Sequence, residues 1–205
     1  MVLEQGNCQG HVERLANPLP DLDEVCFIDI ETTGLDPHRE RIVTIQARHL
    51  GETKVWKEWE LGEVGCLRNL FDLLSQPGAR GKSFVGYNIL KFDVPFIDVR
   101  LRELGVMDER VWHLLHDLHY VDLYQLLGDY YARARQWYLS MTTVRNDVVN
   151  AEIPELYEAG EYTTIEEYVE REMRAMEAFY EQVRGQEFYK ELVRLREAML
   201  KEAPR

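Results

Sequence analysis

The chain has 205 residues with a formal net charge of −13; 45% of the residues are hydrophobic and 30% are charged. This composition can form the core of one ordinary domain, which excludes a disordered chain, and its acidity excludes a protein that holds nucleic acid through a broad basic surface. With no apolar run of roughly 18 residues, no secretory pattern and only three scattered cysteines (Cys8, Cys26 and Cys66), we expect a soluble, cytoplasmic protein with reduced thiols and no membrane contact.

The first elements in chain order are an arm and three strands. Residues 1–20 are expected to form an N-terminal arm. Strand-like runs follow at Glu24–Ile30, Arg41–Leu50 and Thr53–Leu61. The short loops between them contain glycine or proline, which favours an antiparallel meander.

The next elements mix helices with short strands. Residues 65–78 are predicted to form a helix, whose apolar face comprises Leu67, Leu70, Phe71 and Leu74. A strand at residues 83–88 precedes a helix that has Pro95 in its first turn. Residues 118–127 are predicted to be a strand that runs into a helix. Strands followed by mixed strands and helices indicate one α/β domain with a mixed sheet.

The C-terminal part is predicted to be mainly helical. We expect an interruption near Ala151–Gly160 and then a long amphipathic stretch, Thr163–Lys201, broken at Gly185. The apolar positions of this stretch are Ile165, Val169, Met173, Met176, Phe179, Tyr180 and Val183. Their helical spacing predicts that one face of the helix is buried.

Two carboxylates, Asp29 and Glu31, end the first apolar strand in "CFIDIETTGLD". Residues two apart in a strand point to the same face, so these side chains project together. Two desolvated like charges cost several kcal/mol unless a cation compensates them. Oxygen ligands of this kind suit Mg²⁺ or Mn²⁺. On this pair alone, two solvated acids at a strand end remain the more frequent explanation.

Two further stretches carry compatible chemistry. In "VGYNILKFDVPFI", Asn88 follows a strand and Asp93 begins a helix, so an amide and a carboxylate can reach the same region. In "EYVEREMRAMEAFY", Tyr168 and Glu172 are four residues apart and share one helical face. A phenol and a carboxylate placed in this way can orient a water molecule beside a metal ion.

The ordered set Asp29-Ile30-Glu31-Thr32-Thr33-Gly34-Leu35, Tyr87-Asn88-(x4)-Asp93 and Tyr168-(x3)-Glu172 resembles the DEDD superfamily of 3′–5′ exonucleases. It is most similar to the tyrosine-bearing branch, which includes the proofreading domains of family B DNA polymerases and stand-alone archaeal relatives. The resemblance implies a ribonuclease H-like fold, with a five-stranded mixed sheet flanked by helices, over residues 21–184. Residues 185–205 would then form a C-terminal helix packed on this domain or at an interface between copies.

The activity that the resemblance implies is hydrolysis of single-stranded DNA from its 3′ end with two Mg²⁺ or Mn²⁺ ions. Asp29 would bridge both ions, Glu31 and Glu172 would complete one site, and Asp93 would support the cluster. Tyr168 would orient or deprotonate the attacking water.

The resemblance also implies a set of substrate contacts. The terminal nucleotide would be held by Thr32, Thr33 and Leu35, and the penultimate one by Asn88. Phe92 and Phe96 could stack on bases, although both are more often core residues.

Glu172 departs from the family pattern, which has aspartate as the fourth acid. A displacement of about 1 Å can lower a rate by ~10²-fold. Either the helix is set back to suit the longer side chain, or the activity is low and prefers Mn²⁺, or the site has decayed. An enzyme of the same fold that trims RNA 3′ ends, a weakened module that binds nucleic acid or a partner, and a subunit active only in a complex remain alternatives.

Other candidate features have simpler explanations. His113, His116 and His119 do not share one helical face, so a metal site there is not expected. Asp122 is expected to have a structural role or to support the residues of the site from behind. A basic and aromatic run, Arg133, Arg135, Trp137 and Tyr138, is equally compatible with a nucleic-acid contact and with a core. The apolar face of the last helix leaves a homo-oligomer open.

Overall fold

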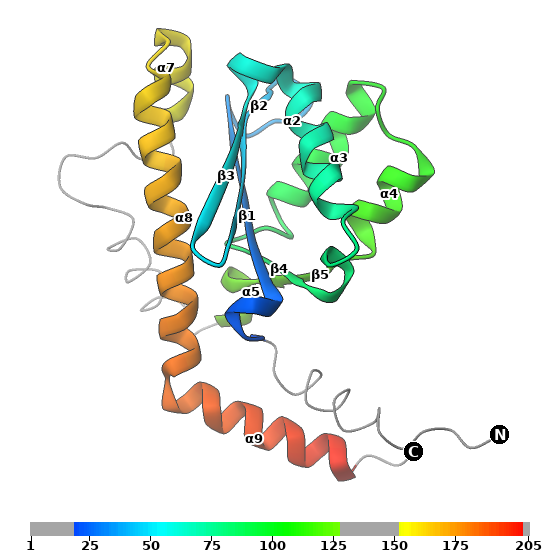
Figure 1. Cartoon of the computed structure of the whole chain (residues 1–205), viewed down its shortest axis with the longest axis vertical. Helices are drawn as coiled ribbons and strands as arrows, with labels where there is room; N and C mark the ends of the chain where they lie inside the picture. Colours follow the sequence, from blue (N-terminus) through cyan, green and yellow to red (C-terminus); the bar gives the residue numbers. More distant parts are fainter. Residues whose placement is uncertain (1–18, 128–151, 203–205) are drawn as a thin grey trace.

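The structure, a computed structural model, describes residues 19–127 and 152–202 (Figure 1). In chain order the elements are η2 (Leu22–Glu24), β1 (Val25–Thr32), β2 (Ile42–His49), β3 (Glu52–Lys57), α2 (Glu58–Leu74), η3 (Ala79–Gly81), β4 (Ser83–Gly86), α3 (Asp93–Glu103), α4 (Glu109–His116), β5 (His119–Asp122), α5 (Leu123–Leu127), α7 (Ile153–Ala159), α8 (Tyr162–Gly185) and α9 (Glu187–Glu202).

A five-stranded sheet with the order β3-β2-β1-β4-β5 forms the centre of the protein. β2 is antiparallel to both β1 and β3, whereas β4 is parallel to both β1 and β5. The predicted mixed sheet of five strands is therefore confirmed. β1 lies in the middle and is buried along almost its whole length, which explains its nearly continuous apolar sequence.

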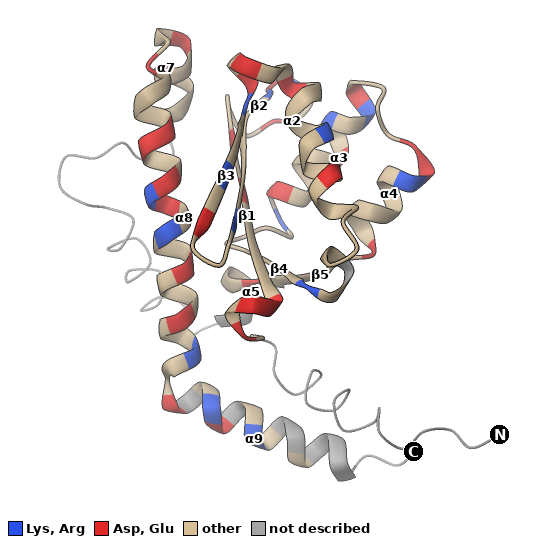
Figure 2. Ribbon diagram, viewed as in Figure 1, with Lys and Arg blue, Asp and Glu red and all other residues tan. Residues whose placement is uncertain are grey.

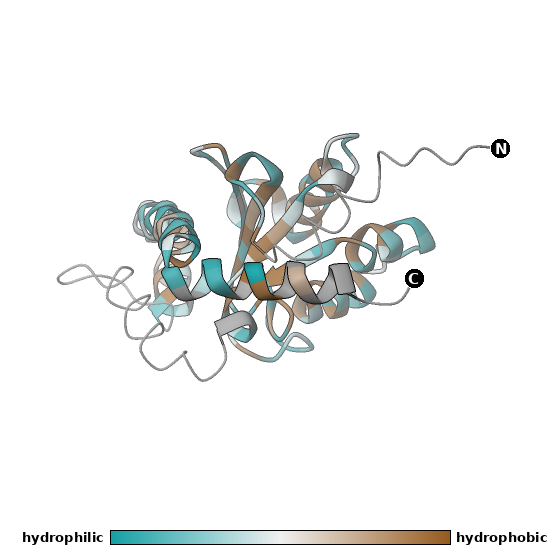
Figure 3. Ribbon diagram, turned by 90° about the horizontal axis from the view of Figure 1, so that it is seen from below, coloured by the Kyte–Doolittle hydropathy of each residue, from teal (hydrophilic) through white to brown (hydrophobic). Residues whose placement is uncertain are grey.

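Different helices cover the two faces of the sheet: α2, α3 and α4 lie on one side and α8 on the other (Figure 1). Viewed from below, the most hydrophobic segments lie between these layers (Figure 3). Cys26, Ile28 and Ile30 of β1 pack in the cluster that contains α2 and α3, whereas Val25 and Phe27 pack beneath α8. Because side chains alternate along a strand, Asp29 and Glu31 follow Phe27 onto the face that α8 covers.

The helix α8 is amphipathic, and all seven of its predicted apolar positions are buried. Its outward surface carries both acidic and basic residues (Figure 2). Arg48 of β2, which is 7% exposed, ties the helix to the sheet. Its guanidinium donates to Glu177 at 2.8 Å and lies 3.6 Å from a carboxylate oxygen of Glu170. The chain turns at Gln186 between α8 and α9, which confirms the predicted break at Gly185.

Two predicted boundaries are wrong. Residues 58–61, predicted as the end of a strand, form the first turn of α2 before a bend at Gly62, where φ is 67°. Trp59 in this turn stacks on Tyr162 with ring centroids 4.4 Å apart, so a tertiary contact overrides the alternating pattern. The predicted interruption at Ala151–Gly160 contains α7, which ends at the left-handed Gly160.

The last two residues of the predicted arm, Leu19 and Pro20, are held by hydrogen bonds to α8 and α9. Leu19 is buried, and its backbone N–H donates to the hydroxyl of Tyr189 in α9 at 2.9 Å. The hydroxyl of Tyr180 in α8 donates to the Pro20 carbonyl at 2.6 Å. These bonds join the start of the described chain to the corner between α8 and α9. Residues 1–18 lie outside the described ranges, and the role of α9 in an oligomer stays a prediction.

Cys26 and Cys66 are buried free thiols, as expected for reduced cysteines. Burial raises the pKa of Cys26 to about 11 and that of Cys66 to about 12. Cys8 lies outside the described residues. Within those residues, none of the helices has the length and apolarity needed to span a bilayer.

Candidate metal centre

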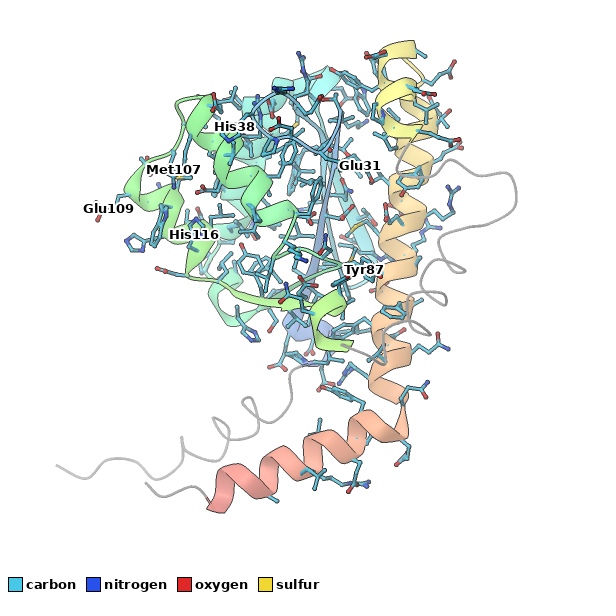
Figure 4. All side chains as sticks on the ribbon, turned by 180° about the vertical axis from the view of Figure 1, so that it is seen from behind. Glu31, His38, Tyr87, Met107, Glu109 and His116 are labelled. Carbon is cyan, nitrogen blue, oxygen red and sulfur yellow. The ribbon has the colours of Figure 1, made fainter. Side chains whose placement is uncertain are left out.

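Three carboxylates from two distant segments meet between the sheet and α8. Asp29 and Glu31 of β1 and Glu172 of α8 each place a carboxylate oxygen within 4.8 Å of the other two. Figure 4 shows Glu31 on β1 beside α8, away from His38 and His116 on the side formed by α3 and α4. Among the residues that the structure describes, no other group of His, Cys, Asp or Glu side chains meets this spacing.

The three carboxylates are poorly solvated. Glu31 is 1% exposed and Glu172 is 9% exposed, while Asp29 is half-buried. Neither carboxylate oxygen of Glu31 accepts a hydrogen bond from the described residues. Burial, followed by the negative charge of Glu172, raises the pKa of Asp29 and of Glu31 well above the usual range. A buried anionic oxygen without a donor is compensated when a cation binds it, so this donor set fits a divalent metal ion.

Asp93 lies beside this group and not within it. It is the first residue of α3, and its Oδ1 accepts the backbone N–H of Ile30 in β1 at 3.1 Å. Burial raises the pKa of Asp93 to about 7, although hydrogen bonds from its own N–H and that of Ile30 oppose the rise. Its charge contributes to raising the pKa of Asp29. The structure therefore brings Asp93 near the predicted cluster, with one oxygen held by β1.

Tyr168 lies one helical turn before Glu172 on the buried face of α8 and is 5% exposed. Burial raises the pKa of its phenol far above the usual range, and the charges of Glu172, Glu31 and Asp29 raise it further. The guanidinium carbon of Arg171 lies 5.7 Å from the centre of the ring. In the metal-free protein the phenol therefore keeps its proton at neutral pH and acts as a hydrogen-bond donor.

Sequence reasoning missed two polar residues of β2 at the same face. The antiparallel register places Gln46 opposite Asp29 and Thr44 opposite Glu31. The side-chain amide of Gln46 donates to Asp29 Oδ2 at 2.6 Å, and the hydroxyl of Thr44 donates to Gln46 Oε1 at 3.0 Å. The available signal was the alternation of Thr44, Gln46 and Arg48 with apolar residues in "RIVTIQARHL". The pattern shows a shared face but not which strand lies opposite.

The predicted contacts to the terminal nucleotide lie at the end of β1 and in the loop that follows it. The hydroxyl of Thr32 donates to the Gly34 carbonyl at 2.7 Å, and that of Thr33 donates to Glu40 Oε2 at 2.6 Å. The loop is therefore closed by its own hydrogen bonds. Leu35 is 85% exposed, and its contact with a nucleotide stays a prediction.

The predicted contacts to the next nucleotide lie after β4. Asn88 has a left-handed φ of 66°, and its backbone N–H donates to Asp122 Oδ1 at 3.0 Å. Asp122 also accepts the Leu90 N–H at 3.1 Å, in agreement with its expected structural role. Phe92 is half-buried against Phe96, with ring centroids 5.5 Å apart. Phe96 is 2% exposed and lies in the core, which is the role that the sequence favoured for it over stacking on a base.

The histidines in and after α4 contact separate partners. His113 pairs with Asp117 at 2.8 Å, His116 with Asp98 at 3.2 Å, and His119 with the Ser83 hydroxyl at 2.7 Å. The basic and aromatic run at residues 133–138 lies outside the described ranges.

Comparisons with known proteins show which family and which folds this chain is similar to. An uncharacterized protein of Methanocaldococcus jannaschii is 32% identical over 149 residues, which cover 66% of this chain and 77% of the relative. The family B DNA polymerase of the archaeon Pyrobaculum calidifontis matches with a TM-score of 0.61 and 20% identity over 78% of this chain. This chain spans only 24% of the polymerase, so the likeness concerns the fold. NrnC of Brucella melitensis bound to pGG matches with a TM-score of 0.36 and 18% identity, over 91% of this chain and 93% of NrnC. A family model described as the RNase_H superfamily matches residues 26–184, and the chain therefore belongs to this superfamily.

Proposed function

We propose that the protein is a metal-dependent 3′–5′ exonuclease that hydrolyses phosphodiester bonds at the 3′ end of single-stranded DNA. The observation that carries the proposal is the group formed by Asp29, Glu31 and Glu172, whose oxygens lie within 4.8 Å of one another on a buried face. Membership of the RNase_H superfamily and the order of the motifs along the chain also support it.

Asp29, Glu31 and Glu172 would hold the ions, with Asp93 as a further charge next to Asp29. Bound Mg²⁺ or Mn²⁺ would lower the pKa of a water molecule and stabilise the charge that develops on the leaving 3′ oxygen, with two ions in the complete site. The protonated phenol of Tyr168 would donate a hydrogen bond that orients the reacting groups. Its position one helical turn before Glu172 on the buried face of α8 places the phenol beside the carboxylates that would hold the ions.

A 3′ end must be unpaired to reach carboxylates beneath α8, which favours a single-stranded substrate. Leu35 would pack on the terminal base, and the loops at Thr32–Thr33 and Asn88 would hold the sugar–phosphate backbone. A few local contacts of this kind are compatible with a net charge of −13, because they do not need a basic surface.

The test uses single-stranded DNA and RNA of the same sequence, labelled at the 5′ end, with Mg²⁺, Mn²⁺ or a chelator. We expect a ladder that shortens from the 3′ end of DNA, is abolished by the chelator, and is lost in Asp29→Asn and Glu31→Gln. Glu52→Gln, which alters an exposed acid of β3, is the matched control with unchanged products. Faster shortening of RNA would assign the protein to RNA 3′-end trimming. Unchanged bands with every metal and both substrates would contradict the enzyme and favour a binding module.

A further inference from the structure

Gln46 and Thr44 of β2 are polar residues with no solvent exposure, each opposite a carboxylate of β1. Buried polar groups are retained in a core when they are hydrogen bonded. Both ends of the Gln46 amide meet this condition. The nitrogen donates to Asp29 Oδ2 at 2.6 Å, and the oxygen accepts the Thr44 hydroxyl at 3.0 Å.

The contact makes the two oxygens of Asp29 unequal. Oδ2 accepts the N–H donor of Gln46, and the carboxyl group of Asp93 is a second side-chain hydrogen-bond partner of Asp29. A carboxylate oxygen accepts the NH₂ group of the amide, and the Thr44 hydroxyl stabilises this orientation by donating to the other end, Oε1. The rotation of Asp29 is therefore constrained by two residues that are not themselves in the carboxylate group.

We infer that Gln46, oriented by Thr44, is a positioning residue that holds Asp29 so that Oδ1 can bind a divalent cation together with Glu31 and Glu172. The inference rests on the metal centre of the proposed function, but not on the nature of the nucleic acid. Partners that orient metal ligands commonly account for about 10–100-fold in metal affinity.

Calorimetric titration of the full chain with Mn²⁺ tests the inference without measuring hydrolysis. Gln46→Met keeps the length and approximate volume of the side chain and removes both polar ends, so we expect about 10–100-fold weaker binding. Thr44→Val keeps the shape and removes the O–H donor. The amide can still face Asp29 in this variant, so we expect a smaller loss, about fivefold, as for one net hydrogen bond.

A double variant shows whether Thr44 affects Mn²⁺ binding through Gln46 or independently of it. If Thr44 acts through Gln46, the combination of Thr44→Val with Gln46→Met binds Mn²⁺ as weakly as Gln46→Met alone. The matched control is Gln125→Met, since the Gln125 amide also donates to a carboxylate, that of Asp122 at 3.2 Å, which is not a member of the three-carboxylate group. Mn²⁺ binding by this control should not change. The unfolding temperature in chelator, measured for each variant, would fall in parallel with binding if the role of Gln46 were only structural.

Unchanged Mn²⁺ binding by Gln46→Met would overturn the inference. Tighter binding would also overturn it, by showing that the amide competes with the cation for Asp29. If the unsubstituted chain binds no Mn²⁺, both the inference and the metal centre are wrong. If it binds Mn²⁺ and hydrolyses neither DNA nor RNA, the proposed nuclease is wrong while weaker binding by Gln46→Met still supports the positioning role.

Discussion

Glu172 on α8 faces Glu31 on β1, and their carboxylate oxygens lie within 4.8 Å of each other and of Asp29. Glu31 is 1% exposed, and burial together with the charge of Glu172 raises its pKa well above the usual range. Desolvated carboxylates this close repel one another, so the metal-free protein carries a local destabilisation that a cation can relieve.

Removing one of these charges should stabilise the metal-free protein. At pH 8 in chelator we expect Glu31→Gln to raise the free energy of unfolding by ~1–3 kcal/mol, the usual scale for an unsatisfied buried group. Scanning calorimetry would show this as about 2–4 °C per kcal/mol. Mn²⁺ should stabilise the unsubstituted chain much more than Glu31→Gln. Glu52→Gln on the exposed part of β3 is the control. A lower unfolding temperature of Glu31→Gln in chelator would contradict this prediction.

Titration of the buried carboxyl of Asp93 should make the folded protein less stable as the pH rises, the reverse of the usual effect of a carboxyl group. Burial raises the pKa of Asp93 from 3.8 to about 7. The folded state therefore holds this proton more tightly than the unfolded state, so the stabilisation is complete below pH ~4 and is lost as the pH rises to ~7.

Urea unfolding in chelator measures this effect. The difference in midpoint between the unsubstituted chain and Asp93→Asn should change in favour of Asp93→Asn as the pH rises from ~4.5 to ~7.5. Asp98→Asn is the control, because the hydrogen bond from Arg102 lowers the pKa of Asp98, so its titration lies below this pH range and its difference in midpoint should stay constant. A difference for Asp93→Asn that is constant with pH would show that the prediction is wrong.

Glu172→Asp tests the departure from the family pattern. In the structure the longer side chain brings its carboxylate into the group with Asp29 and Glu31. Shortening it by one methylene should withdraw the carboxylate by about 1 Å and lower kcat/KM on single-stranded DNA by ~10²-fold. Glu167→Asp, on the exposed face of the same helix, should have no effect. Higher activity of Glu172→Asp would mean that α8 is placed for an aspartate.

Tyr168→Phe should separate metal binding from the chemical step. The phenol is 5% exposed and retains its proton because burial raises its pKa. Loss of this donor should lower kcat by ~10²-fold while calorimetry shows unchanged Mn²⁺ affinity. If the phenol acts only as a hydrogen-bond donor, the pH–rate profile should keep its shape in Tyr168→Phe, because such a donor does not contribute an alkaline limb. A profile that loses a limb in Tyr168→Phe would instead identify the phenol as a base.

Leu35→Ala should weaken substrate binding without altering the metal centre. Leu35 is 85% exposed, so truncating it removes little folded-state packing. If it packs on the terminal base, KM for single-stranded DNA should rise about tenfold, the scale of partly burying a leucine side chain, with kcat nearly unchanged. Leu50→Ala provides a matched control in the hairpin between β2 and β3, where the leucine is 63% exposed. Equal kinetics for Leu35→Ala and the unsubstituted chain would remove Leu35 from the binding site.

Much of this protein follows from local sequence. Strand periodicity alone places Asp29 and Glu31 on one face, and helical periodicity alone places Tyr168 with Glu172. The order of the motifs indicates the ribonuclease H-like fold, which the strand order and the family match confirm. These features depend on the spacing of residues within one strand or helix, and this spacing can be read from the sequence.

The tertiary structure decides which of these faces meet. Only the packing of α8 on β1 brings Glu172 to Glu31, and only the register of β2 places Gln46 opposite Asp29. The same long-range packing ends β3 at Lys57 and buries Phe96 in the core. The register of β2 and the position of α8 result from burying side chains of distant segments together. A local sequence pattern does not specify which distant segment will pack against it.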